Sequence, residues 1–135
     1  MTYEIETTPS EATVTVHAVT REELFAHVLS AALAAAYAGT PPDGLYEGQV
    51  VPIQAVGDDD ATLLRELVKD CLQAVRTAPG TLRPPRWMAF DEKRVTANLP
   101  MTAPRAGTKD VSLRSAEVLP DLSARLVIGF PQAGH

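Results

Sequence analysis

The stretch that decides the fold runs from residue 3 to residue 25 and reads YEIETTPSEATVTVHAVTREELF. Polar and apolar residues alternate over Tyr3–Thr7 and again over Thr13–Ala18, which is the period of a half-buried strand. Residues 8–11 (TPSE) separate these two segments, and proline cannot donate a hydrogen bond to a sheet, so they predict a turn. The stretch therefore predicts two consecutive strands.

A helix is predicted directly after the second strand. Thr20 and Glu23 have the spacing of a capping box, in which the hydroxyl accepts from the amide of residue 23 and the carboxylate reaches back. We expect the helix to end near Tyr37, because Gly39 suits a C-terminal cap and the prolines at 41 and 42 begin a loop that reaches residue 44. Its apolar residues recur in steps of three and four: Leu24, Phe25, Val28, Leu29, Ala32 and Leu33.

A second helix is predicted between three aspartates, Asp58, Asp59 and Asp60, and the pair Pro79-Gly80. The aspartates form the densest carboxylate cluster and would suit a divalent cation. We favour a capping role, because acids at a helix N-terminus complement the dipole and bind free amides. The apolar face holds Leu63, Leu64, Leu67, Val68, Cys71, Leu72 and Val75, so Cys71 is predicted to be a core thiol.

The remaining segments predict strands. Pro52 indicates that the strand at 50–56 lies at a sheet edge or carries a bulge. A loop is expected at 100–107, and a hairpin is expected around Pro120-Asp121. The full order is ββαβαββββ, which predicts an α+β fold with two helices packed on a mostly antiparallel or mixed sheet, in one domain spanning 1–135. The strands are expected at 3–7, 13–18, 50–56, 87–90, 95–99, 111–117 and 122–130.

Composition excludes several classes of protein. Apolar residues make up 45% of the 135 residues and charged residues 21%, as in an ordinary globular domain. The net charge of −5 argues against a nucleic-acid clamp, which needs a surplus of cations. One cysteine cannot form an internal disulfide, and the N-terminal residues include Glu4 and Glu6, unlike a signal peptide. The segment 29–38 is too short to span a bilayer, so we expect a cytoplasmic protein.

Motifs of common catalytic sites are absent from the sequence, including the G-x-S-x-G elbow, the glycine-rich phosphate loop and paired-cysteine zinc spacing. His17 lies on the polar face of a strand and His27 on the first helix, and we expect ordinary structural or solvated roles for both. His135 is the terminal residue. Five arginines either converge on one face of the sheet or, as we favour, form ordinary surface charge: Arg83, Arg86, Arg94, Arg105 and Arg114.

The sequence resembles the archease family, small proteins that assist the tRNA-splicing RNA ligase. The family has Y-E-x-x-D-H-T-A-D, a strand and then L-E-E-L-F at the start of a helix. Here Tyr3-Glu4 and residues 22–25 (EELF) stand in that register without a gap. The second helix, with its acidic lead-in before Leu63-Leu64, and the final strand at 124–128 (ARLVI) are also similar to the family's.

The resemblance implies a metal site that this sequence carries only in part. Where the family has D-H-T-A-D, residues 7–11 read TTPSE, so Thr7 and Thr8 replace the first Asp and the His. Glu11 replaces the last Asp, a metal ligand in the family, and is the candidate metal ligand here. Gly129 stands where the closing strand of the family carries another ligating Asp, and the family's lysine falls at or near Ser112. The implied cofactor is a divalent cation, calcium or magnesium, held by oxygen ligands.

The function implied by the resemblance is that of a non-enzymatic accessory protein that docks on an RNA ligase and helps to place a metal ion or nucleotide. A diverged protein-binding module on the same fold is the first alternative. A small hydrolase-type enzyme is the second, and it requires His17 and a carboxylate such as Glu11 to share a water-excluding pocket with at least one shifted pKa.

Overall fold

The computed structural model describes residues 3–37, 45–78, 80–103 and 111–130. These residues form two helices and eight strands, so the predicted α+β class is confirmed. In chain order the elements are β1 (Tyr3–Thr7), β2 (Glu11–His17), α1 (Arg21–Ala36), β3 (Leu45–Val56), α2 (Asp60–Thr77), β4 (Thr81–Leu82), β5 (Arg86–Phe90), β6 (Arg94–Ala103), β7 (Ser112–Leu119) and β8 (Ser123–Gly129).

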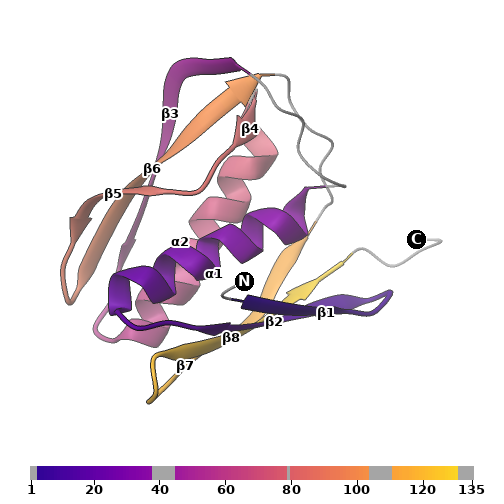
Figure 1. Cartoon of the computed structure of the whole chain (residues 1–135), viewed down its shortest axis with the longest axis vertical. Coiled ribbons are helices and arrows are strands. Elements are labelled where there is room, and N and C mark those ends of the chain that lie inside the picture. Colours follow the sequence, from indigo (N-terminus) through magenta and orange to yellow (C-terminus); the bar gives the residue numbers. More distant parts are fainter. Residues whose placement is uncertain (1–2, 38–44, 79, 104–110, 131–135) are drawn as a thin grey trace.

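The strands divide into two antiparallel sheets, where the sequence predicted one sheet. The first sheet has the order β1-β2-β8-β7, and the second has the order β3-β6-β4 with β5 also paired to β6. Figure 1 shows both helices between the two sheets. α1 packs against β1, β2 and β8, whereas α2 contacts β7 of the first sheet and β3 of the second. Each sheet therefore has one face on the core and one face turned away from it.

Two predicted hairpins close the first sheet. The turn between β1 and β2 is held by a hydrogen bond from the amide of Thr8 to the carbonyl of Glu11, 2.8 Å long. The turn at Pro120-Asp121 joins β7 to β8 and ends at Leu122, whose φ of 57° lies in the left-handed region. This is the usual build of a three-residue hairpin loop, although glycine is the common residue at its last position.

The helix caps form largely as predicted. The Thr20 hydroxyl accepts from the amide of Glu23, but the Glu23 carboxylate bonds to His27 at 3.1 Å instead of reaching back. Asp59 accepts from the amide of Thr62 at 2.7 Å, a bond that lowers the pKa of the Asp59 carboxyl. The capping role of the aspartates is therefore confirmed at Asp59. α1 ends at Ala36, with Tyr37 as its C-cap, and α2 ends at Thr77. The predicted caps and breakers at 39, 41–44 and 79 lie outside the described residues.

One hydrophobic core extends across both sheets. α1 is buried around most of its circumference, because it lies between the two sheets. Many of its buried residues are alanines, whose small side chains allow close packing. α2 has one apolar face, and its residues Leu63, Leu64, Leu67, Val68 and Cys71 are fully buried, so the predicted core position of Cys71 is confirmed. Burial of these apolar side chains is the main stabilising contribution to the fold.

α2 is also bonded to the edges of both sheets. The Asp70 carboxylate accepts from the backbone amide of Gln54 on β3 at 2.9 Å. On the other side the Arg76 guanidinium donates to the carbonyl of Val111, just before β7, at 2.6 Å. β3 is an edge strand, as Pro52 predicted, and Pro52 lacks the amide that an edge would otherwise expose.

Arg21 connects the beginnings of the two helices. Its Nε donates to Asp60 at 2.8 Å, and its Nη1 donates to the carbonyl of Asp91 in the turn between β5 and β6 at 3.0 Å. The guanidinium also lies over the rings of Phe25 and Phe90, 5.2 and 4.6 Å from their centroids. One side chain thereby ties α1, α2 and the second sheet together through hydrogen bonds and cation–π contacts.

β6 continues further than the sequence predicted. Residues 100–103 were expected to be loop, but they belong to the strand, with Pro100 opposite Val50 on β3. The carbonyl of Pro100 accepts a hydrogen bond from the amide of Arg83. Pro100 therefore contributes an acceptor to the sheet, although a proline has no amide to donate. β4 was not predicted, and it pairs with this extension at Thr102 and Met101. Neither of the two described helices is long and apolar enough to cross a membrane.

Leu67→Ala should lower the free energy of unfolding by about 2–5 kcal/mol, because it removes a fully buried side chain at the centre of α2. The matched control is Leu119→Ala, whose leucine is 39% exposed at the end of β7 and should cost less than about 1 kcal/mol. Urea unfolding curves measure both. Equal losses in the two variants would show that α2 does not face the core.

Candidate functional site

Three positions that the sequence singled out lie side by side at one end of the first sheet. Glu11, the first residue of β2, is opposite Gly129 on β8, and Gly129 is opposite Ser112, the first residue of β7. Directly opposite residues on neighbouring strands have Cα atoms about 4.5–5.5 Å apart. We call Glu11, Gly129 and Ser112 the sheet-end row. It lies on the face turned away from the helices, because the residue after Glu11, Ala12, is buried.

Arg114 covers this row. A bulge between Leu113 and Ser115 interrupts the pairing of β7 with β8, and bulges commonly redirect a side chain. The Arg114 guanidinium donates to the Glu11 carboxylate, with 3.1 Å between Nη1 and Oε2. A Cβ at position 129 would overlap the Nε of Arg114, so the glycine leaves the space in which the guanidinium lies against β8. Sequence reasoning missed this role, because no local pattern marks a bulge.

The residues at the sheet-end row do not fit a divalent cation. Calcium needs six to eight oxygen ligands and magnesium needs six, and the row supplies one carboxylate that is already paired with Arg114. Gly129 has no side chain, and Thr8 uses its hydroxyl in bonds to the amides of Ser10 and Glu11. Among the described residues no group of three or more His, Cys, Asp or Glu could hold a metal ion.

His17 and Glu11 do not share a pocket. Glu11 is the first residue of β2 and His17 is the last, so about 20 Å of strand separates them. His17 is exposed and lies opposite Ser123, whose hydroxyl donates to Asp121 at 2.5 Å. That hydrogen bond, with a smaller contribution from His17, lowers the pKa of the Asp121 carboxyl. The Ser123 hydroxyl thus donates to Asp121 and not to His17, so Ser123 and His17 do not form a nucleophile–base pair.

Cys71 and His27 have structural surroundings. Burial, with a smaller effect of the neighbouring Asp70, raises the pKa of the Cys71 thiol to about 12, so it does not supply a thiolate at neutral pH. His27 pairs with Glu23 one helical turn earlier. His135 lies outside the described residues.

The described arginines do not all converge on one face. Arg114 lies over the first sheet, whereas Arg86 and Arg94 are exposed on the second sheet. Arg83 donates to the hydroxyl of Thr102 at 3.3 Å. Arg105 lies outside the described residues. The preferred interpretation, dispersed surface charge, matches this arrangement for the four that are described.

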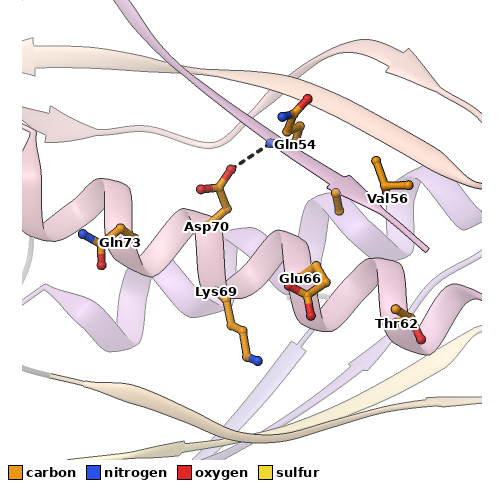
Figure 2. Close-up of a pocket in the computed structure, with 8 residues that line it drawn as sticks. Gln54, Val56, Thr62, Glu66, Lys69, Asp70 and Gln73 are labelled. Atoms are coloured by element: carbon orange, nitrogen blue, oxygen red, sulfur yellow. Dashed lines mark hydrogen bonds between the residues drawn. The ribbon is translucent and has the colours of Figure 1, made fainter.

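A groove runs between the free edge of β3 and α2, and sequence reasoning did not find it. It has a volume of about 570 Å³, and its lining includes Gln54 and Val56 from β3 and Thr62, Glu66 and Asp70 from α2. Figure 2 shows Asp70 pointing from the helix to the backbone of Gln54, while Lys69 points away from the strand. A peptide strand added at this edge would need the amides of β3 as hydrogen-bond donors. The amide of Gln54 is already bonded to Asp70, and Pro52 has no amide.

The sequence matches no model of a known protein family, and no curated protein matches it.

The melting temperature of the protein should not change when millimolar calcium, magnesium or manganese is added. An ion raises it only by binding the native state, and the sheet-end row does not supply enough ligands for that. Thermal unfolding of the wild type with each ion and with a chelator checks this. A rise in the wild type that disappears in Glu11→Ala would contradict the account and would restore Glu11 as a metal ligand.

Proposed function

We propose that the chain is a non-enzymatic accessory protein of the archease type, which binds an RNA ligase of the tRNA-splicing class through its sheet-end row. The observation that carries this proposal is the register of the first sheet. Glu11, Gly129 and Ser112 are far apart in the sequence, yet the strand pairing places in one row the positions to which the resemblance assigns the site.

Arg114 gives this row its chemistry. The side chains of Arg114 and Glu11 are 46% and 36% exposed, and ion pairs at such positions contribute about 0–1 kcal/mol. A ligase group can therefore replace Glu11 at small cost. The guanidinium is planar and lies against β8, so its remaining donors suit a carboxylate or phosphate oxygen of the partner. In this proposal Arg114 supplies a fixed positive charge without a metal ion.

The second candidate is a module of the same fold that binds a different protein. It is favoured by the same contact between Arg114 and Glu11, because the family's metal ligands are replaced by a pair that needs no metal. Both candidates use the same surface, and the identity of the partner distinguishes them.

The test is binding to the RNA ligase encoded by the same genome, measured by calorimetry or biolayer interferometry, together with the rate of ligase guanylylation. Glu11→Lys places a second cation beside Arg114 and should weaken the complex about tenfold or more, with a matching loss of stimulation. The matched control is Glu117→Lys, an exposed glutamate on the same face, opposite Arg125, and it should bind like the wild type.

Failure of the wild type to bind the ligase, with a well-folded ligase that ligates RNA alone, would remove the archease-type function and leave the second candidate. Binding that is equally strong in Glu11→Lys would retain the function and remove the sheet-end row as its site.

A further inference from the structure

The two sheets turn chemically different faces away from the core. On the first sheet, alternation places Glu4, Glu117 and Arg125 outward, so acids and bases are interspersed. Such a mixed charged face is typical of solvated surface. The outward face of the second sheet has another composition, and we call it the second-sheet face: residues 50, 52, 54 and 56 of β3, residues 94, 96, 98 and 100 of β6, and residues 86, 88 and 89 of β5, where Met88 stands in a bulge and is exposed.

The second-sheet face combines exposed apolar side chains with arginine. Met88 is 66% exposed, Val56 65% and Val50 41%. Arg86 and Arg94 are its charged residues, and none of its members is an acid. Enrichment in Met and Arg with depletion of Asp, Glu and Lys is the composition that distinguishes protein interfaces from other surface.

The polar groups of this face are not bonded to one another. Within the described part of the chain, neither Arg86 nor Arg94 has an ion pair. The face also carries the uncharged side chains of Gln54, Thr96 and Asn98, which can accept or donate hydrogen bonds. Acids border this face on two sides. Asp70, which bonds to the amide of Gln54, and Glu66 lie along the β3 edge, and Asp91 and Glu92 lie in the turn before β6, where their carbonyls accept from Arg21.

A hollow lies between the two arginines. It has a volume of about 450 Å³, and Pro52, Ile53, Met88 and Ala97 supply its apolar lining. Gln54, Thr96, Asn98 and Asp70 supply its polar lining, and the Asp70 carboxylate is already bonded to the amide of Gln54. Arg86 is opposite Asn98, and Arg94 is four residues from Asn98 along β6. At about 3.3 Å per residue, the arginines lie about 13 Å apart along the strand direction, with the hollow between them.

We propose that the second-sheet face docks an acidic, apolar segment of a partner protein. Two carboxylates of the segment pair with Arg86 and Arg94, and an apolar side chain between them enters the hollow beside Met88. An extended segment reaches both arginines when its carboxylates stand four residues apart, as in the pattern Glu-x-Leu-x-Glu, because its own rise is the same. This proposal does not depend on the ligase or on the sheet-end row.

A nucleic acid suits this face less well than a protein segment. Single-stranded nucleic acid needs a track of cations and exposed aromatic rings on which bases stack. The face has two arginines, and the aromatic residues of β5, Trp87 and Phe90, belong to the opposite side, where the Phe90 ring contacts the rings of Trp87 and Phe25. A partly apolar hollow with an exposed arginine beyond each end instead complements side chains of a protein.

The test is a titration of nitrogen-15-labelled protein, followed by amide chemical shifts, with a synthetic peptide that contains Glu-Thr-Leu-Thr-Glu. We expect saturable shifts at β3, β5 and β6, with β1 and β2 unchanged. The double variant Arg86→Glu with Arg94→Glu should bind at least about tenfold more weakly, since two attractions become repulsions. The matched control is Arg125→Glu on the first sheet, which should bind like the wild type. Dispersed spectra establish that each variant is folded.

Four results would overturn the proposal. The first is the absence of saturable shifts up to millimolar peptide. The second is equal binding of a peptide in which lysine replaces both glutamates. The third is a loss of binding in Arg125→Glu as large as the loss in the double variant. The fourth is that a single-stranded RNA of mixed sequence shifts the same amides more strongly than the peptide does.

Discussion

The position of α2 between the edges of two sheets is the constraint on which the rest of the structure depends. β3 and β7 do not pair with each other, and the helix fills the space between them with a face of leucine and valine. Asp70 bonds to the β3 edge and Arg76 bonds at the start of β7, so polar groups hold both sides of the helix. An unpaired edge amide invites strand addition, and Asp70 together with Pro52 leaves no free edge amide at positions 52 and 54 of β3. The helix therefore both builds the core and closes an edge.

This arrangement determines where the chain can meet other molecules. Because the helices occupy the space between the sheets, each sheet keeps one outward face (Figure 1). The first sheet carries the sheet-end row at one end, where Arg114 and Glu11 form an exposed pair over a glycine. The second sheet carries two exposed arginines and, between them along the strand direction, a partly apolar hollow. The two surfaces belong to different sheets, so a partner on one leaves the other accessible.

The sequence predicted the features that depend on local chemistry. The Thr20 and Asp59 caps, the edge position of Pro52 and the buried stripe of α2 all follow from neighbouring residues, and each was confirmed. The division into two sheets depends on which distant strands pair, and periodicity carries no information about that choice. The same limit applies to the site. Sequence patterns placed Glu11 in a turn region, but its contact with Arg114 requires a bulge more than a hundred residues away.

The measurement that tests the functional account most directly is hydrogen–deuterium exchange of the chain with and without the RNA ligase, resolved by mass spectrometry. The account predicts slower exchange on complex formation at the turn before Glu11, at the start of β7 and at the end of β8, because these segments form the sheet-end row. Unchanged exchange in these three segments, or protection confined to the second sheet, would contradict it.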